Sequence, residues 1–394
     1  MRILLSAFAC HPGRGSEPGV GWQLAVHLAR DHEVWVLTDG RNRPGILSAL
    51  NVESRVSLNF RFLRLPGGYP LVHHVHYFNW QLWACRIASE LHHKVGFDLV
   101  HHVTYMTSWQ PSFMGRLGAA FIWSAGPRET TPSAFLREVS PRSRRSEISR
   151  NVGLSTMGRI TEWITGRSAS VVLSSSPPWT WPRPLPVRYF PLGGLTEAEL
   201  GTLATEGDGK GGRIRLASVG RLLGWKGFSL GLRAFARVHE KEPNTEYWII
   251  GEGPERAFLE RLASRLKVDH AVRFLGGRTR EEVFRLLGEA DVLVHPSFHE
   301  QFGYVMAEAM AAGRPVVCLD VGPAPALVPD ECGRRISVTS PEAVVQGLTD
   351  ALLALVQSPT KRRSMGEAGR EWVRREWNWD SVTGRVVGVY QGAL

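Results

Sequence analysis

Residues 291–317, DVLVHPSFHEQFGYVMAEAMAAGRPVV, carry the pattern that decides the fold of the second half of the chain. The apolar run Val292–His295 predicts a buried strand, and the polar residues after it predict a turn. A helix is expected next, followed by a second strand that starts at Pro315. A strand, a turn, a helix and another strand in succession are typical of an α/β domain with a parallel sheet.

Two glutamates, Glu300 and Glu308, stand in this stretch with seven residues between them. At about 1.5 Å rise per residue their carboxylates would lie about 12 Å apart, too far for both to act on one bond. The expected helix start at Phe302, Gly303 and Tyr304 offers backbone N–H groups to a phosphate. The spacing therefore predicts a ligand with a sugar at one end, phosphates in the middle and a nucleoside at the other.

The bulk composition is that of an ordinary soluble globular chain, with 43% hydrophobic and 21% charged residues. The 394 residues predict two to three domains of roughly 150 residues each. Four scattered cysteines without a CxxC pair argue against a disulfide framework or zinc site and favour a cytoplasmic location. We expect neither a signal peptide nor a membrane-spanning helix, because the apolar runs are too short. The net charge of +10 is a real bias, for which the alternatives are solubility alone, an acidic substrate, an anionic membrane or nucleic acid.

Predicted strands and helices alternate along both halves of the chain. In the first half we expect strands at Ile3–Phe8, Glu33–Thr38, Val56–Leu63, Asp98–Val103, Phe121–Ser124 and Ser170–Ser174, and helices at Trp22–Arg30, Val72–Lys94 and Gly158–Thr165. In the second half we expect strands at Ile214–Val219, Glu246–Ile250 and Val272–Leu275, and helices at Phe228–Glu240, Glu255–Leu266, Arg280–Glu289, Pro341–Val356, Thr360–Arg374 and Trp377–Tyr390.

This alternation predicts an α/β protein of two doubly wound, Rossmann-like domains that face one another across a cleft. The expected domains are residues 1–190 on the acceptor side and residues 213–375 on the donor side. A proline-rich connector within Pro182–Gly212 would join them. A C-terminal helix in residues 376–394 is expected to pack back on the first domain.

Two cations follow the predicted strand Ile214–Val219 in the sequence GRLLGWKG, namely Arg221 and Lys226. Loops that leave the carboxyl ends of parallel strands face the ligand crevice. Two cations flanked by glycines suit a diphosphate, because glycine lets the backbone approach closely. A solvated turn is the alternative for this loop taken alone, and the neighbouring helix start at Gly303 favours the phosphate site.

Further glycines follow other predicted strands. Gly251 belongs to a Gly-Glu-Gly-Pro turn, for which a tight turn is the default expectation. Gly277 and Arg278 lie where backbone groups would touch a base or ribose. Gly19 and Gly21 precede the expected helix at Trp22–Arg30 and predict a second glycine-lined helix start, although a dinucleotide fingerprint needs a third glycine.

Two adjacent histidines, His101 and His102, end the predicted strand Asp98–Val103 at its carboxyl edge. Successive side chains of a strand point to opposite faces, so at most one of them faces the cleft. Each is a candidate ligand contact, and a core histidine is the usual alternative.

Arginines and tryptophans crowd the middle of the chain. The arginines are Arg137, Arg142, Arg144, Arg145 and Arg150, and the tryptophans of the first half include Trp80, Trp83, Trp109, Trp123, Trp163, Trp179 and Trp181. Core packing explains most of the tryptophans. Together with the arginines they also predict peripheral contact with an anionic membrane surface. Nucleic acid is not expected as a partner, because no recognition motif accompanies these residues.

Taken together, these motifs resemble the retaining glycosyltransferases of family four, which have the two-domain GT-B fold. The resemblance is strong over about residues 214–380 and weaker over residues 1–190. It is carried by Glu300-(seven residues)-Glu308, Gly220-Arg221-(four residues)-Lys226, GEGP at 251–254, ADVLVHPS at 290–297, GSEPGVGW at 15–22 and FDLVHH at 97–102. The first-half motifs resemble members that build bacterial polysaccharides or glycoconjugates.

The resemblance implies metal-independent transfer of a hexose-type sugar from a UDP- or GDP-linked donor, with retention of anomeric configuration and without a further cofactor. It implies that Arg221 and Lys226 hold the diphosphate and that the backbone at residues 302–304 adds donors. It also implies that Glu308 binds ribose hydroxyls and Glu300 the sugar. The acceptor would be a glycan, a lipid-linked saccharide or a small molecule.

Two positions depart from the family pattern. Members often carry His-x-His where this chain has His101, His102 and Val103, so either histidine is a candidate for the catalytic site. Gln301 replaces the usual glycine after the first glutamate. The alternative functions are another GT-B sugar-nucleotide enzyme, such as an epimerase or a hydrolase, and a nonenzymatic sugar- or membrane-binding protein.

Overall fold

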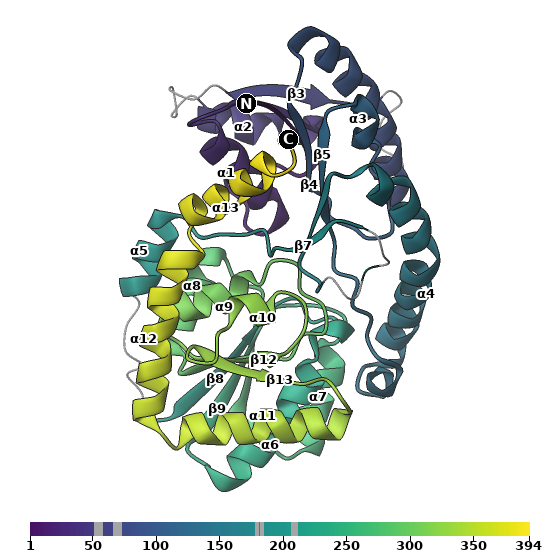
Figure 1. Ribbon diagram of the computed structural model, residues 1–394. Helices are drawn as coiled ribbons and strands as arrows, with labels where there is room; N and C mark the ends of the chain where they lie inside the picture. The colour runs from purple at the N-terminus through teal and green to yellow at the C-terminus, as the bar shows by residue number, and fades with distance from the viewer. Residues whose placement is uncertain (51–57, 66–72, 178–180, 182–184, 206–211) are drawn as a thin grey trace. The chain divides into compact units, whose positions relative to one another are not determined.

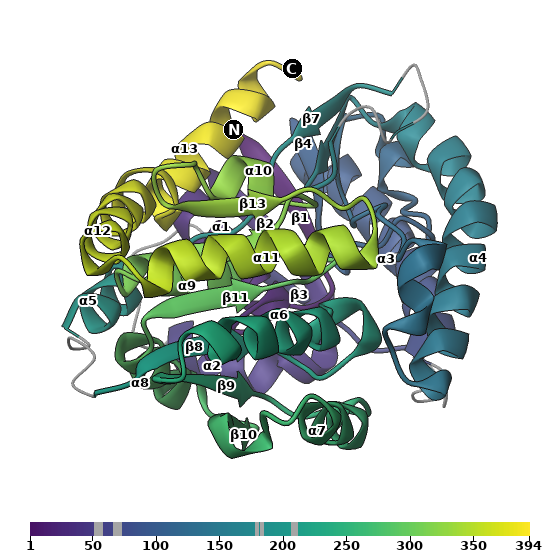
Figure 2. The same cartoon turned by 90° about the horizontal axis from the view of Figure 1, so that it is seen from below.

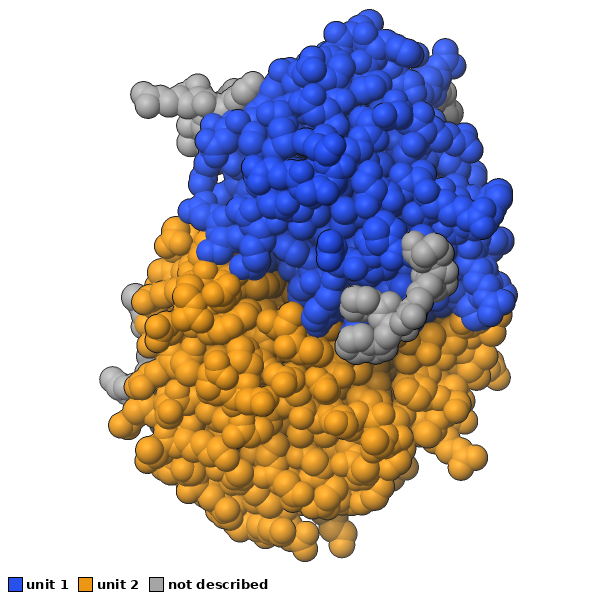
Figure 3. All heavy atoms as spheres, viewed as in Figure 1, with its two compact units in different colours: residues 1–128, 153–194, 379–394 blue, residues 129–152, 195–378 orange. Residues whose placement is uncertain are grey.

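The computed structural model describes residues 1–50, 58–65, 73–177, 181, 185–205 and 212–394. The predicted contributions of Trp179, of Pro182 and Pro184 in the connector, and of the turn at residues 207–211 lie outside these ranges. The chain forms two compact units, each of which is continuous in space but not in sequence (Figure 3). Unit 1 comprises residues 1–128, 153–194 and 379–394, and unit 2 comprises residues 129–152 and 195–378.

The described strands of unit 1 form one parallel sheet in the order β3-β2-β1-β4-β5-β6-β7 (Figure 1). They are β1 (Arg2–Ala7), β2 (Glu33–Asp39), β3 (Leu58–Leu63), β4 (Leu99–Thr104), β5 (Ala120–Ala125), β6 (Val171–Ser174) and β7 (Val187–Tyr189). The helices are α1 (Glu17–Leu28), α2 (Arg43–Leu50), α3 (His73–Val95) and α13 (Trp379–Gln391), together with the second half of α4 (Pro141–Ile164).

Helix α13 packs on α1 within unit 1. Arg30 at the end of α1 donates to Asp380 of α13 at 2.5 Å, and the rings of His27 and Trp379 lie 6.0 Å apart. The last residues of the chain are therefore part of the fold of unit 1.

The described strands of unit 2 form a second parallel sheet in the order β10-β9-β8-β11-β12-β13. They are β8 (Ile214–Val219), β9 (Thr245–Ile250), β10 (Val272–Gly276), β11 (Val292–His295), β12 (Val316–Leu319) and β13 (Gly333–Ile336). The helices are α5 (Glu197–Thr205), α6 (Phe228–Lys241), α7 (Arg256–Arg265), α8 (Arg280–Glu289), α9 (Tyr304–Ala311), α10 (Ala324–Leu327), α11 (Pro341–Val356) and α12 (Pro359–Glu376).

Two apolar layers cover the sheet of unit 2. Helices α6, α7 and α11 contribute to one core cluster, and α6 and α11 lie side by side in Figures 1 and 2. Helices α5, α8 and α9 contribute to the other cluster. The strand residues between the layers, such as Val292 and Leu293, are fully buried because neighbouring side chains point to opposite faces.

The predicted fold class is confirmed, since both sheets are parallel and strands alternate with helices. Several predicted boundaries were wrong. Helix α1 begins five residues earlier than expected, and α4 extends 17 residues further toward the N-terminus than the predicted Gly158–Thr165. Helices α2, α5 and α10 and strands β7 and β13 were not predicted. No helix of the described chain is long and apolar enough to cross a membrane.

Candidate active site

The sheet of unit 2 has a topological switch point between β8 and β11, which are hydrogen-bonded neighbours although three helices and two strands separate them in sequence. Ligands of open α/β sheets bind at such a point, outside the carboxyl ends of the strands. The loop after β8 contains Arg221 and Lys226, and the loop after β11 contains Glu300. A ligand site is therefore expected at the carboxyl ends of β8 and β11.

The loops after β8, β9 and β10 contact one another closely at glycines. Gly251 has φ of 139°, and a Cβ there would lie 2.0 Å from the carbonyl oxygen of Gly220. Its N–H donates to Gly276 O at 2.8 Å, and Leu222 N donates to Glu252 O at 2.9 Å. The expected tight turn at Gly251 is thus present, and its glycine allows two loop backbones to touch.

Lys226 is placed by a short 3-10 turn, Gly224–Lys226, that ends at Gly227. Gly227 has φ of 63°, and a Cβ there would lie 2.1 Å from the carbonyl oxygen of Pro296. Phe298 N also donates to Trp225 O at 2.8 Å. These contacts hold the loop after β8 against the loop after β11.

Lys226 and Glu300 meet where the two loops touch. The Lys226 ammonium donates to Glu300 Oε2 at 2.7 Å, and His295 Nε2 donates to the same oxygen at 3.0 Å. Burial raises the pKa of Glu300, but the charge of Lys226 and the hydrogen bond from His295 outweigh it and hold that pKa well below its ordinary value. Glu300 is therefore an anion at neutral pH and accepts hydrogen bonds only.

Helix α9 begins where the sequence predicted a helix start. Its N-cap is Gly303, with φ of 78°, which has no side chain with which to cap the helix. A Cβ on Gly303 would lie 2.4 Å from Leu327 Cδ2 and would be strained at this φ, so the position favours glycine. The amino end of a helix attracts anions through its N–H groups and dipole. Phe302 is buried beside it, with its ring 5.9 Å from that of Tyr304.

Glu308 lies one turn from the end of α9 and is buried. Its Oε1 accepts from Arg280 Nη2 at 2.8 Å, and the same Arg280 nitrogen lies 2.9 Å from Glu199 Oε1. Burial raises the pKa of Glu308 to about 7 with the help of Glu199 and Glu300, and Arg280 opposes the shift. The sequence singled out neither Arg280 nor Glu199.

The segment 129–152 belongs to unit 2 and surrounds His299, the residue before Glu300. Arg150 Nη1 donates to His299 Nε2 at 2.6 Å, and Thr131 Oγ1 donates to Glu147 at 2.6 Å. Burial and the charges of Arg150 and Lys226 hold the pKa of His299 well below its ordinary value, so His299 is neutral. The sequence did not indicate the pairing of Arg150 with His299, since the two residues lie 149 positions apart.

The other predicted donor residues of unit 2 are more exposed. Arg221 is exposed and makes no ion pair within the described chain. Arg278 Nη1 lies 3.2 Å from Glu282 Oε1, one turn further along the chain. Gly277 lies directly after β10 at the same sheet edge as Gly251 and Arg221.

Gly19 and Gly21 do not precede a helix, as we expected, but lie in the first turns of α1. A Cβ on Gly19 would lie 2.5 Å from Arg14 O, and a Cβ on Gly21 would lie 2.4 Å from Ala9 O. Their absent side chains let the loop after β1 pack against α1. This packing explains both glycines without a ligand.

His101 and His102 are both buried in unit 1. His101 has a partner on each ring nitrogen, Tyr390 Oη at 2.6 Å and Ser124 Oγ at 2.8 Å. His102 Nε2 lies 3.3 Å from Tyr77 Oη. Burial lowers the pKa of His101 to about 3 and that of His102 to about 4, so both are neutral. The contacts of His101 are those of a core histidine, and Tyr390 comes from the C-terminal helix.

Unit 1 has its own switch point between β1 and β4, and a buried carboxylate lies there. Glu17 Oε1 accepts from Met106 N at 2.7 Å, and burial raises the pKa of Glu17. The rings of Tyr77 and Tyr105 stack nearby with centroids 3.6 Å apart, and Tyr105 has φ of 61°. Sequence analysis missed this cluster, although a glutamate in a glycine-rich loop after a first strand was a usable signal.

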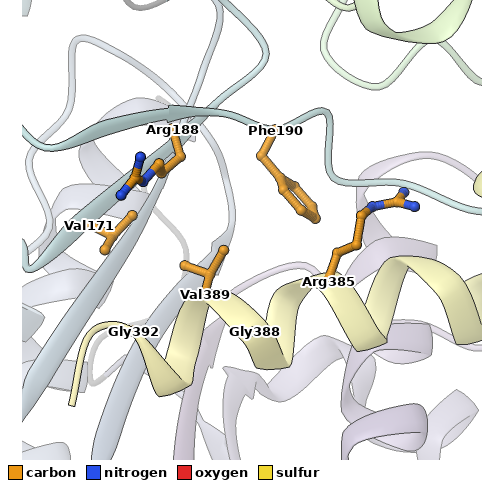
Figure 4. Close-up of a pocket in the computed structure, with 7 residues that line it drawn as sticks. All are labelled: Val171, Arg188, Phe190, Arg385, Gly388, Val389 and Gly392. Atoms are coloured by element: carbon orange, nitrogen blue, oxygen red, sulfur yellow. The ribbon is translucent and has the colours of Figure 1, made fainter.

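A pocket of about 370 Å³ lies in unit 1 between α13 and strands β6 and β7. In Figure 4 the side chains of Arg188 and Arg385 lie on either side of Phe190 and Val389. The remaining lining residues are Val171, Gly388 and Gly392. None of the predicted site residues lines this pocket.

Residues 206–372 match the sequence family described as "Glycosyl transferases group 1". Among curated relatives, a D-inositol 3-phosphate glycosyltransferase of Corynebacterium aurimucosum is 32% identical over 186 residues, which are 45% of this chain and 43% of the relative. An MMP alpha-(1->4)-mannosyltransferase of Mycolicibacterium hassiacum is 34% identical over 171 residues, which are 43% of this chain and 40% of the relative. The matched part thus spans less than half of each relative.

Solved structures match nearly the whole chain at low sequence identity. Sucrose-phosphate synthase from Thermosynechococcus elongatus has a TM-score of 0.66 and 19% identity, with 99% of this chain and 98% of that chain covered. The Anabaena protein HepE, in complex with UDP and glucose, has a TM-score of 0.62 and 16% identity, with 99% of both chains covered. These similarities establish a fold of two Rossmann-like domains of the GT-B type. Residues 206–372 of a chain with this fold are therefore similar in sequence to the glycosyl transferases group 1 family.

Proposed function

We propose that the protein is a retaining hexosyltransferase of family four that uses a UDP- or GDP-linked sugar without a metal. The contact of Lys226 and His295 with Glu300, beside the start of α9, carries this proposal. An ammonium group has three hydrogen-bond donors. Lys226 uses one on Glu300 and keeps others for the β-phosphate of a donor at the helix start.

The charge of Glu300 suits a residue that holds the sugar. As an ionised carboxylate it orients sugar hydroxyls and cannot act as a general acid. The structure records no protein partner for its Oε1 within the described residues, so this oxygen is left for the ligand. The fixed N–H groups of α9, Lys226 and Arg221 would stabilise the charge that develops on the leaving phosphate.

The first test is a donor screen with purified protein. UDP-, GDP- and ADP-linked hexoses are incubated with candidate acceptors, and the released nucleotide is detected by mass spectrometry. Proton NMR of the product reports the anomeric configuration. Release of nucleotide with a retained linkage is expected for one donor class. Absence of nucleotide binding and release with all donors would overturn the proposal.

The same experiment separates the alternative enzymes. An epimerase yields an inverted sugar still attached to its nucleotide, whereas a hydrolase yields free sugar whatever acceptor is present. A nonenzymatic binding protein gives neither product. Transfer that depends on the acceptor supports the transferase over all three.

The acceptor side includes a proposed anionic membrane surface with a lipid-linked saccharide or glycan. The five central arginines do not support it as one patch, because Arg144 and Arg150 bond inside unit 2. Better support comes from large apolar side chains exposed on α3 and the second half of α4, which lie side by side in Figures 1 and 2. These are Val75, Phe78, Leu82, Met157, Ile160 and Trp163, the last 61% exposed. Exposed apolar patches of this kind mark interaction surfaces.

Flotation with anionic liposomes tests the membrane surface. We expect salt-sensitive binding of the wild-type protein and a clear loss in Trp163→Ser. The control is Arg285→Gln, on an exposed face of α8. Equal recovery of wild type and Trp163→Ser in the lipid fraction, or no binding at all, would remove the membrane from the proposal.

A further inference from the structure

Arg280 occupies an unusual position for a cation. It is the first residue of α8, where the helix dipole disfavours positive charge. Two carboxylates compensate for that position, Glu308 at 2.8 Å and Glu199 at 2.9 Å from the same guanidinium nitrogen. Helices α5, α8 and α9, which supply these three residues, pack against one another.

Further contacts fix the side chains of Glu199 and Arg280. Glu199 Oε2 accepts from Thr196 N at 2.8 Å, which leaves Oε1 directed at Arg280. The Arg280 guanidinium also lies over the rings of Phe284, at 5.0 Å, and Tyr304, at 5.7 Å. Such cation–π contacts restrict a long side chain to one orientation. Arg280 therefore presents a fixed donor to Glu308.

The ion pair with Arg280 uses one carboxylate oxygen of Glu308 and not the other. Oε1 binds Arg280, and within the described chain no protein partner is recorded for Oε2. The charged groups that face this carboxylate are Arg280 of α8, Glu199 of α5 and Glu300 of the loop after β11. Arg370 of α12 bonds the carbonyls of Ala311 and Ala312 at the other end of α9.

We propose that Arg280, oriented by Glu199, is a positioning residue that holds the Glu308 carboxylate charged and aims its free oxygen at the ribose hydroxyls of the nucleotide. The proposal deepens the proposed function and rests on it. It also assigns Glu199 the opposite electrostatic effect, because its charge competes with Glu308 for the same guanidinium.

Nucleotide affinity should then depend on pH. The pKa of Glu308 lies at about 7, and only the ionised carboxylate accepts from both ribose hydroxyls. We expect the Kd for UDP or GDP, measured by calorimetry, to rise about tenfold from pH 8 to pH 6. The 2′,3′-dideoxy nucleoside diphosphate is the matched probe, since its phosphates titrate in the same way but it lacks the hydroxyls. Its Kd should follow only the phosphate titration.

Two variants should move this profile in opposite directions. Arg280→Gln removes the attracting charge and should weaken UDP or GDP binding about tenfold at pH 7, with partial recovery at pH 9. Glu199→Gln removes the competing charge and should tighten binding several-fold at pH 6. Arg280→Lys should restore part of the affinity, and Arg285→Gln on the same helix should behave as wild type.

A purely structural role for Arg280 predicts a different outcome. It would weaken binding of the normal and dideoxy nucleotides equally and at every pH, and Glu199→Gln would also weaken binding. That result overturns the inference while leaving the proposed function intact. Failure of UDP, GDP and ADP to bind wild type at any pH would instead overturn the proposed function.

Discussion

Glu300 and Glu308 are two buried carboxylates of one unit, and their pKa values move in opposite directions. Burial raises the pKa of both. At Glu300 the Lys226 ammonium and His295 serve this one carboxylate, and the pKa falls well below its ordinary value. At Glu308 the single cation, Arg280, is shared with Glu199, and the pKa rises to about 7.

The comparison teaches that, where burial raises the pKa of two carboxylates alike, the number of anions that share each cation decides which of them is charged. It also assigns different tasks to the two ends of the proposed donor site. The end at Glu300 keeps a permanent anion near the phosphates and sugar. The end at Glu308 has a carboxylate poised to lose or gain a proton near neutral pH.

The variant Lys226→Ala should have the largest effect. It removes the cation that serves Glu300 alone, which is what distinguishes Glu300 from Glu308. It leaves a buried carboxylate with His295 as its remaining partner and removes a donor to the leaving phosphate. We expect kcat to fall about 100- to 1000-fold, measured as released nucleotide. Lys226→Arg, which keeps the charge, should retain more activity than Lys226→Ala. Full turnover in Lys226→Ala would refute the assigned role.

The pH dependence of stability should separate the two glutamates next. The folded-state pKa of Glu308, about 7, lies above its ordinary value of 4.5. Its contribution to the free energy of unfolding is therefore fully present below pH 4.5 and is lost as pH rises through 7. The free energy of unfolding of Glu308→Gln, relative to that of wild type, should therefore increase by on the order of 3 kcal/mol between pH 5 and pH 9.

Glu300→Gln is the matched variant for that experiment. The pKa of Glu300 is lowered, so its contribution is present above pH 4.5 and is lost only as pH falls below that value. The difference in unfolding free energy between Glu300→Gln and wild type should stay constant from pH 6 to pH 9. Urea denaturation at several pH values measures how the unfolding free energy of each variant, relative to wild type, changes with pH. The same pH dependence for both variants would contradict the comparison.

Glu308→Ala should affect nucleotide binding more than it affects the chemical step. Loss of a charged acceptor for the ribose hydroxyls is worth about 1.5 to 3 kcal/mol, which corresponds to a Kd about 10- to 150-fold higher at pH 8. Calorimetry with UDP and GDP measures it. A Kd equal to that of wild type would place the ribose elsewhere.

Arg278→Ala should have the smallest effect. Its guanidinium pairs with Glu282, both side chains are 39% exposed, and such surface pairs contribute little. We expect less than about a threefold change in nucleotide Kd, because any contact with the base would use backbone groups. A larger loss in the same calorimetric series would add Arg278 to the residues whose side chains bind the donor.

The sequence singled out both glutamates, but it indicated a partner only for Glu300 and none for Glu308. Lys226 and Glu300 follow strands that are neighbours at a switch point, so their loops and glycines indicated a shared site. Arg280 lay in a predicted helix without a visible partner. Its partner Glu199 comes from α5, which falls in a stretch that we treated as a connector.

The first half was harder to predict for a similar reason. His101 is held by Tyr390, which lies 289 positions away on the last helix. Helix α4 was predicted too short because its first turns are rich in arginine and serine and lack an apolar period. Their packing depends instead on unit 2, where Ser143 Oγ donates to Glu255 at 2.6 Å. Contacts of this kind leave no periodic signal along the chain.

A crystal structure with the nucleotide sugar selected in the donor screen tests the central claim most directly. The account predicts that a Glu308 oxygen lies about 2.6 to 3.2 Å from a ribose hydroxyl and that Glu300 lies at a similar distance from a hydroxyl of the sugar. The diphosphate should lie between them, at the start of α9 and beside Lys226. A donor bound with its ribose away from Glu308, or with its sugar away from Glu300, would contradict the account.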